Sequence, residues 1–215
     1  MTEPIPAATV VLLRAAPGGV GVETLMLRKN AGQSFGGMWV FPGGRLEPDD
    51  DGPAAAAVRE AQEETGLDLA RDDLVPFAHW VPPEGAPKRF ATWFFLAALP
   101  PGAADVVVDG GEIGDHVWTS PADALERHAA GEVELAPPTW VTLHSLAEAV
   151  SPEDALARAR REEIAYFSTR IRGHGEALLA VWAPDAAYEG GDVDAAGPRH
   201  RLVMATHGGW TYERT

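Results

Sequence analysis

Three glutamates lie close together in the stretch REAQEETG, at Glu60, Glu63 and Glu64. On an α-helix each residue advances by about 100°, so Glu63 and Glu64 fall roughly 60° and 40° to either side of Glu60. Like charges at this spacing cost a helix roughly 0.2–0.5 kcal/mol per pair. A divalent cation turns this repulsion into attraction, and Mg²⁺ prefers oxygen ligands. The cluster is therefore a candidate metal site, with a solvated acidic surface as the common alternative.

A glycine pair precedes the predicted helix. Gly43 and Gly44 follow the apolar run MWVF, and glycine lets the backbone approach a ligand closely or turn a carbonyl toward a metal. Pro53 suits the first position of the helix, and Gly66 suits its end. The order of loop, helix and carboxylates indicates a functional site more strongly than either part alone.

Arg59 is placed to connect this helix to the loop before it. It lies four residues before Glu63 and near the acidic loop 49–51, so it can pair with either. Either Asp51 or Gly52 can cap the helix.

The side of the helix away from the glutamates carries small side chains, which predict close packing on a sheet. Ala56 is expected on the glutamate side, where it leaves room beside the carboxylates. The residues of the predicted packing face are Ala54, Ala55, Val58, Ala61 and Thr65.

Together, Gly44, Asp50 and residues 59–67 resemble the Nudix box. That family signature is a Gly, five residues, Glu, seven residues, then Arg-Glu-apolar-x-Glu-Glu-x-Gly-apolar. The second half matches at every specified position, with Ala61 as the apolar residue. The loop departs from the signature, because Asp50 or Asp51 replaces the loop Glu and one extra residue follows.

The resemblance implies an α/β/α sandwich with a mixed β-sheet and an enzyme that hydrolyses a nucleoside diphosphate linked to another moiety. It implies that Glu60, Glu63 and Glu64 bind Mg²⁺ or Mn²⁺. It also implies that Gly43 offers its carbonyl to the metal and that Arg59 orients the carboxylates. Bound metal would neutralise the diphosphate and activate water.

The general base is open at this stage. Glu63 is one choice, and Glu112 in DGGEIGDHVW is another, since some family members use a carboxylate outside the box. An acidic loop residue without a catalytic role is an equally good interpretation of Glu112. Asp115 and His116 are weaker candidates.

The substrate is predicted from the segments that flank the box. GQSFGGMWVFPGG, HWVPPEGAPKRFATWFFLA and PPTWVTLHSLAE resemble a coenzyme-A-diphosphatase-like branch, although Gln33 stands where the coenzyme A motif has Arg. Coenzyme A or an acyl-CoA is the leading substrate. ADP-ribose, a dinucleotide or a nucleotide sugar is the alternative, and a Nudix-like nucleotide sensor without catalysis is a further one.

Two basic segments are candidates for contact with substrate. Lys88 and Arg89 can meet a phosphate, with a solvated hairpin tip as the alternative. The segment 199–201 (Arg-His-Arg) can fold over the active site, with charges at a strand edge as the commoner interpretation. Some of the seven tryptophans can form a platform for adenine, while most are expected in the core.

Composition limits the remaining classes of function. A net charge of −15 opposes binding to a nucleic acid polymer, and the absence of cysteine excludes disulfides. We find no secretory signal and no run of ~20 apolar residues, so we expect a cytoplasmic protein that does not contact the membrane.

The 215 residues predict one domain, with a Nudix core at about 5–135 and an extension of helices and a β-rich tail at about 136–215. Helices within 121–161 offer a surface for a possible homodimer. Helices are expected after Ser120, Pro138 and Ser151, and a hairpin is expected at the C-terminal end. The strands expected in the core are 8–13, 22–27, 38–41, 74–81, 89–98 and 116–118.

Overall fold

The computed structural model of the protein describes residues 3–32, 35–86, 88–99, 102–103, 105–108, 110–205 and 209–215. Its larger sheet is mixed and runs in the order β3-β2-β1-β6-β5-β8, while β4 pairs with β1 and β7 pairs with β2 outside this path. The strands are β1 (Ile5–Ala15), β2 (Val22–Lys29), β3 (Trp39–Val40), β4 (Gly43–Arg45), β5 (Val75–Val81), β6 (Phe90–Ala98), β7 (Ile113–Thr119) and β8 (Ala165–Ser168). β1 runs parallel to β6, and β5 runs parallel to β8.

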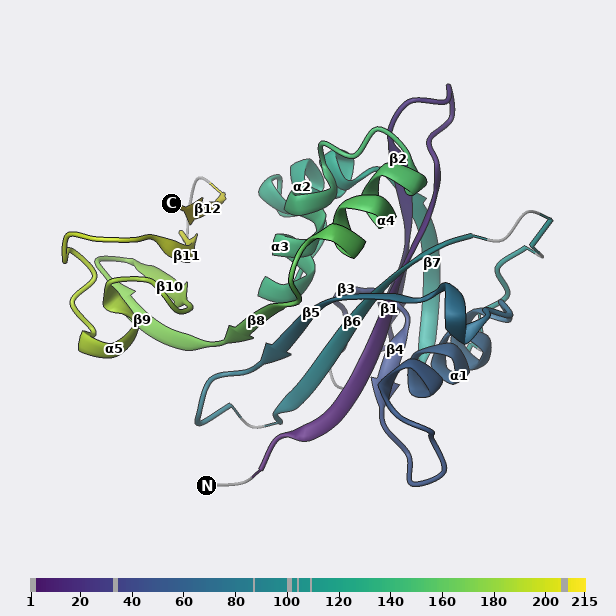
Figure 1. The fold of residues 1–215 in the computed structure, drawn as a ribbon, viewed down its shortest axis with the longest axis horizontal. Helices are drawn as coiled ribbons and strands as arrows, with labels where there is room; N and C mark the ends of the chain where they lie inside the picture. Colours follow the sequence, from purple (N-terminus) through teal and green to yellow (C-terminus); the bar gives the residue numbers. More distant parts are fainter. Residues whose placement is uncertain are drawn as a thin grey trace.

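Helices cover both faces of this sheet (Figure 1). One face packs on α1 (Pro53–Thr65), which contacts β1 and β4. The other side holds α2 (Pro121–Ala129), α3 (Pro137–Leu146) and α4 (Pro152–Arg161), with α4 against β5 and β6. β1 is a near-continuous buried apolar run because both of its faces are covered. The predicted α/β/α sandwich with a mixed sheet is confirmed.

The helix ends follow the local signals in the sequence. The Ser120 and Ser151 side chains accept hydrogen bonds from the backbone N–H groups of Asp123 and Asp154, at 3.1 and 3.2 Å. These bonds satisfy donors that the first turn of a helix leaves unpaired. α1 instead begins after Gly52, with no side-chain cap, and ends at Gly66 in the left-handed conformation.

A second, antiparallel sheet forms the C-terminal part of the molecule, in the order β12-β11-β10-β9. Its strands are β9 (Arg170–His174), β10 (Ala177–Val181), β11 (His200–Met204) and β12 (Trp210–Arg214), and α5 (Ala187–Gly190) lies between β10 and β11. This sheet confirms the predicted β-rich tail and its final hairpin. A single 3₁₀ turn, η1 (Arg71–Asp73), precedes β5.

Aromatic rings connect the two sheets. Trp80 of β5 stacks on Phe167 of β8 with a centroid distance of 3.7 Å, and the fully buried Trp182 meets both rings edge to face. Such aromatic pairs favour one fixed arrangement of the packed rings.

The basic segment 199–201 neither folds over the active site nor lies at a strand edge, the two positions predicted for it. β11 is an interior strand of the C-terminal sheet, and both His200 and Arg201 are buried. The Arg201 guanidinium donates two hydrogen bonds to Asp185, at 2.7 and 2.6 Å. This segment is therefore part of the C-terminal core, because the pair with Asp185 allows a charged side chain to be buried.

Within the described ranges, no helix has both the length and the apolar character needed to cross a bilayer.

Candidate active site

The face of α1 that packs inward matches the predicted face only in part. Ala61 and Thr65 are buried as predicted, and the half-buried Ala54 and Val58 also pack against the core. Ala54, Ala55 and Val58 are only half-buried, whereas Ala56 is fully buried and does not leave open space beside the carboxylates. The helix is rotated so that the inward side includes one of the three glutamates. The buried residues of α1 are Ala56, Ala57, Ala61, Glu64 and Thr65.

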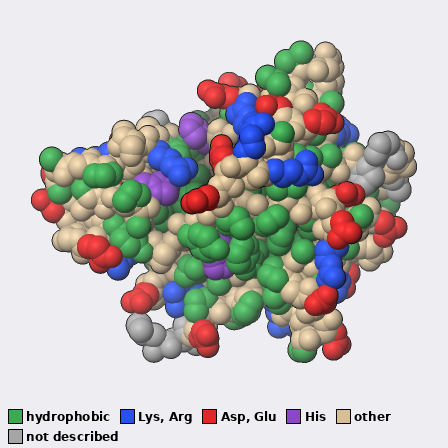
Figure 2. Space-filling model, in the orientation of Figure 1, with side chains coloured by type: hydrophobic (Ala, Val, Ile, Leu, Met, Phe, Trp, Pro, Cys, Tyr) green, Lys and Arg blue, Asp and Glu red, His purple; other side chains and the backbone are tan. Residues whose placement is uncertain are grey.

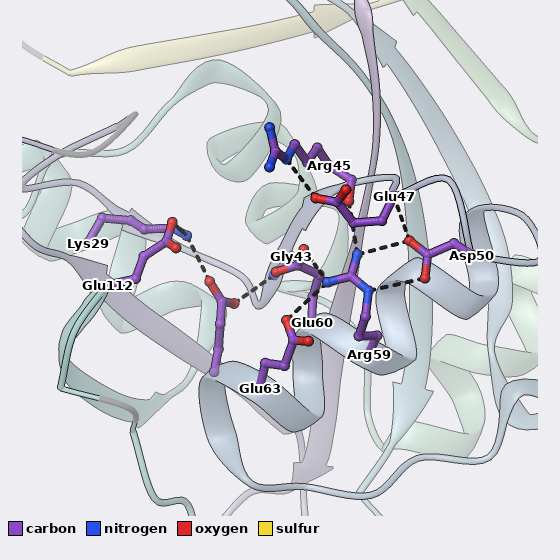
Figure 3. Close-up of polar contacts among 10 residues, drawn as sticks. Lys29, Gly43, Arg45, Glu47, Asp50, Arg59, Glu60, Glu63 and Glu112 are labelled. Atoms are coloured by element: carbon purple, nitrogen blue, oxygen red, sulfur yellow. Dashed lines mark hydrogen bonds and ion pairs between the residues drawn. The ribbon is translucent and has the colours of Figure 1, made fainter.

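Arg59 is the centre of a polar network that joins the loop to the helix (Figure 3). Its Nε and Nη2 donate to the two oxygens of Asp50, at 3.1 and 2.9 Å, and Nη2 also donates to the Arg45 carbonyl. Its Nη1 donates to both Glu60 and Glu63, at 2.9 and 3.0 Å. The pair with Arg59 lowers the pKa of Asp50. Asp50 is thus the loop acid that holds the arginine.

The glycine pair is required by close approach on two sides. A Cβ at Gly43 would lie 2.7 Å from the Cα of Thr9 in β1. A Cβ at Gly44 would overlap the carboxylate of Glu60. Glycine at position 43 therefore lets β4 pair closely with β1, and glycine at position 44 leaves the Glu60 carboxylate in place. The Gly43 N–H donates to Glu64 at 2.9 Å, so this backbone contacts the glutamate cluster through its amide.

Lys29 belongs to the site, although the sequence analysis did not predict it. Its Nζ lies 2.7 Å from Glu64 and 2.7 Å from Glu112, so it joins the helix carboxylate to the loop before β7. Lys29 is buried at the end of β2. The available signal was its rarity, because it is one of only two lysines and closes an apolar strand.

Burial determines the electrostatics of the carboxylates. It raises the pKa of Glu64 to about 7, against the opposing contacts with Lys29 and the Gly43 N–H. Burial also raises the pKa of Glu60, and the contact with Arg59 partly offsets this rise. For Lys29, burial lowers the pKa, but the contacts with Glu64 and Glu112 outweigh it and the net shift is upward. Perturbed groups of this kind cluster at functional sites.

The donor set suits a divalent cation. Glu60 and Glu63 offer carboxylate oxygens, which Mg²⁺ and Mn²⁺ prefer, and both converge on one nitrogen of Arg59. The positive charge of that guanidinium lies where the two carboxylates meet. Within the described ranges, no three Asp, Glu, His or Cys side chains are already gathered as an ion site. The residues fit a cation that replaces the Arg59 contacts to the glutamates while Asp50 retains the arginine.

The other predicted residues lie apart from this network or outside the description. Lys88 and Arg89 lie between β5 and β6, where Arg89 lines a hollow of about 500 Å³ together with Arg170 and Arg172 of β9. Gln33 lies outside the described residues.

Two further candidates lie on β7. Asp115 is exposed and lines a different hollow, of about 660 Å³, with Arg28 and Arg127. His116 is half-buried and pairs in register with Leu27 of β2.

The family model for the NUDIX domain matches residues 4–139. This match covers more than half of the chain and includes β1, the glycine pair, α1 and Glu112. The chain belongs to the NUDIX family.

Two curated proteins align with part of the chain. It is 32% identical over 85 residues to the acyl-coenzyme A diphosphatase NUDT19 of Gallus gallus, covering 38% of this chain and 22% of that protein. It is 50% identical over 41 residues to the 8-oxo-dGTP diphosphatase of Proteus vulgaris, covering 19% of this chain and 36% of that protein. The chain therefore spans well under half the length of these relatives.

Solved structures show the same fold. A NUDIX hydrolase from Alicyclobacillus acidocaldarius superimposes with a TM-score of 0.64 at 26% identity, covering 73% of this chain and 97% of that one. The NUDIX domain of Shewanella oneidensis NrtR, solved with ADP-ribose, superimposes with a TM-score of 0.55 at 15% identity, covering 75% and 91%. These similarities confirm the predicted Nudix-type fold.

Proposed function

We propose that this protein is a metal-dependent hydrolase that cleaves the diphosphate linkage of a nucleoside diphosphate joined to another moiety. The observation that carries the proposal is the convergence of Glu60 and Glu63 on Arg59, beside a glycine that leaves room for the Glu60 carboxylate. Membership of the NUDIX family supports the same reaction class.

Glu60, Glu63 and Glu64 are the proposed ligands of Mg²⁺ or Mn²⁺, together with the Gly43 carbonyl. When bound, the cation would neutralise the diphosphate and lower the pKa of an attacking water. Arg59 positions Glu60 and Glu63 through its Nη1, and Asp50 fixes Arg59 from the other side. Lys29 positions Glu64.

Glu63 is the proposed general base. Its side chain is 55% exposed, so its free oxygen can reach a substrate, and its contact with Arg59 orients it. Glu112 is the second candidate, but its carboxylate is held 2.7 Å from Lys29. A base must lie within hydrogen-bond reach of the proton it removes, and Glu63 shares its helix with the proposed metal ligand Glu60, whereas Glu112 lies in the loop before β7.

Coenzyme A or an acyl-CoA is the proposed substrate. The partial similarity to the acyl-coenzyme A diphosphatase of Gallus gallus supports this choice, as do the segments around the box. Lys88 and Arg89 are the proposed contacts for a substrate phosphate, and Arg89 lines the hollow that also holds Arg170. ADP-ribose, a dinucleotide or a nucleotide sugar is the alternative substrate class.

One incubation with mixed substrates tests the proposal. Coenzyme A, acetyl-coenzyme A, ADP-ribose, NADH and diadenosine polyphosphates are supplied with Mg²⁺ or Mn²⁺, and products are identified by mass spectrometry. The expected products are 4′-phosphopantetheine and 3′,5′-ADP from coenzyme A. Release of AMP from another substrate, with coenzyme A unchanged, would retain the hydrolase and reject the substrate.

The variant Glu63→Gln separates an enzyme from a sensor. We expect turnover to fall at least about 100-fold, which is the lower range for loss of a general base. Glu163→Gln is the matched control, because Glu163 is exposed and lies after α4, and its turnover should equal that of the wild type. Tight nucleotide binding by the wild type without any turnover would show a sensor.

A further inference from the structure

A straight row of residues crosses the larger sheet from the box to the C-terminal extension. Ala8 of β1 is the register partner of Gly44 on one side and of Trp93 on the other. Trp93 is in turn opposite His79 of β5, and His79 is opposite Tyr166 of β8. Side chains directly opposite one another on paired strands point to the same face. We call Gly44, Ala8, Trp93, His79 and Tyr166 the cross-strand row.

The row lies on the α1 face of the sheet. Its first member borders the Glu60 carboxylate, and Ala8 and Trp93 pack with the core beneath α1. Neighbouring strands are about 4.8 Å apart, so Trp93 is about 10 Å from Gly44 and Tyr166 about 19 Å. The row therefore starts at the proposed catalytic carboxylates and continues past the part of the sheet that α1 covers.

The far end of the row is an open aromatic surface. Trp93 and His79 are half-buried, and Tyr166 is 63% exposed. The ring centroid of His79 lies 4.6 Å from that of Trp93 and 5.8 Å from that of Tyr166. Figure 2 shows a broad area of hydrophobic side chains near the centre of the view, where β5 and β6 lie in Figure 1.

We propose that Trp93, His79 and Tyr166 form a stacking platform for the planar heteroaromatic ring of the substrate nucleotide, with its diphosphate at the carboxylates beside Gly44. This inference rests on the proposed function and adds the place where the base binds. It assigns a binding role to Tyr166, which belongs to the C-terminal extension and not to the matched NUDIX domain.

Two properties favour a nucleotide base over a protein partner. The platform lies close to the carboxylate site, because Trp93 is about 10 Å from Gly44 across the sheet and α1 covers only the fully buried Ala8 between them. Its rings are also uncharged, since burial lowers the pKa of His79. Every base has a flat π-face, so stacking on such rings supplies binding energy without requiring a particular hydrogen-bond pattern.

Equilibrium binding of ADP and of inorganic pyrophosphate, each with Mg²⁺, tests the platform by calorimetry. Only ADP carries a base. The Tyr166→Ala variant should bind ADP about five- to tenfold more weakly, the lower range for loss of one stacked ring, and should bind pyrophosphate as the wild type does. Tyr166→Phe keeps the ring and should match the wild type for both ligands. Leu178→Ala removes an exposed apolar side chain from the C-terminal sheet and should change neither.

Three results would overturn the platform. The first is unchanged ADP binding by Tyr166→Ala, and the second is an equal loss of affinity for ADP and for pyrophosphate. The third is that Tyr166→Ala dissociates a dimer in sedimentation experiments while its affinity for ADP stays unchanged. The last would identify the surface as an interface between copies of the chain. Because binding is measured without turnover, weaker ADP binding by Tyr166→Ala supports the platform even if the protein hydrolyses none of the substrates.

Discussion

Two buried ion pairs, one at the box and one in the C-terminal sheet, hold their carboxylates in opposite ways. Lys29 contacts Glu64 at 2.7 Å, and Arg201 contacts Asp185 at 2.7 and 2.6 Å. Yet the pKa of Glu64 is raised to about 7, while the pKa of Asp185 is lowered to about 2. Proximity to a cation alone does not determine the charge state of a buried acid.

Hydrogen-bond donors account for part of the difference, and the charge of the neighbouring Glu60, which raises the pKa of Glu64, adds to it. Burial by itself raises the pKa of Asp185, but two bonds from Arg201 and the N–H groups of His200 and Ala187 outweigh it. Glu64 receives one bond from Lys29 and one from the Gly43 amide. Lys29 is moreover shared with Glu112. A carboxylate with fewer donors is less stabilised in its charged form.

The Arg201–Asp185 pair stabilises the fold, whereas the Lys29–Glu64 pair leaves its carboxylate available for another partner. Asp185 has its oxygens fully occupied, so a change of partner would cost stability. Glu64 lies among shared contacts, as the proposed exchange of its lysine for a metal ion would require. Three experiments test this difference between the box and the C-terminal sheet.

The largest effect is expected from Arg201→Met. This variant leaves the Asp185 charge buried without its cation, which typically costs about 3–5 kcal/mol of unfolding free energy. Turnover per folded molecule should be unchanged below the unfolding transition, because the pair lies outside the box. Urea unfolding monitored by circular dichroism measures the loss.

Arg71→Met is the control for that experiment, because the Arg71–Asp51 pair is exposed on both sides and surface pairs of this kind contribute little to stability. Equal stability of the Arg201→Met variant and the wild type would show that the Asp185 pair does not hold the C-terminal sheet.

A smaller effect is expected from Gly44→Ala, which acts on geometry at the box. The added methyl group must displace the Glu60 carboxylate, and a misplacement of about 1 Å can cost about 100-fold in rate. The fold should persist, because the obstacle is the end of a flexible side chain. Steady-state kinetics on the hydrolysed substrate measures the change.

Gly173→Ala in β9 is the matched glycine control, since a Cβ there meets nothing within 4 Å, and it should retain full activity. Wild-type turnover by Gly44→Ala would contradict a fixed position for Glu60.

The smallest effect is expected on the stability of the fold at low pH. Because the pKa of Asp185 is lower in the folded chain than its usual 3.8, the unfolded chain binds more protons as pH falls. The stabilisation is complete above about pH 4 and is lost as pH falls through about 2, by about 2 kcal/mol. An NMR titration of the Asp185 carboxyl carbon should give a midpoint near 2. A midpoint close to 3.8 would show that its four hydrogen bonds do not stabilise the charged form.

The sequence predicted what is encoded locally. The glycine at each end of α1, the serine caps of α2 and α4, and the apolar strands of the core depend on neighbouring residues, and the structure has all of them. The second half of the box could also be predicted from neighbouring residues, because its spacing puts the glutamates on one helix.

The remainder depends on contacts between distant parts of the chain. Lys29 and Glu112 are separated by 83 residues, so no local pattern could pair them. The rotation of α1 was missed because helical periodicity defines a stripe but not the elements that will cover it, and β4 covers the side of Glu64. The pair between Asp185 and Arg201 needs the loop before α5 to meet β11.

The strand β8 gives the C-terminal extension a protective role as well. In the path β3-β2-β1-β6-β5-β8, this four-residue strand is the last member and covers the outer edge of β5. A chain shortened before Ala165 would expose the backbone donors and acceptors of β5, together with the Trp80 ring that Phe167 covers. Unprotected edges of this kind recruit other chains. The extension is therefore also a guard against aggregation, and the isolated NUDIX segment should be harder to keep in solution than the whole chain.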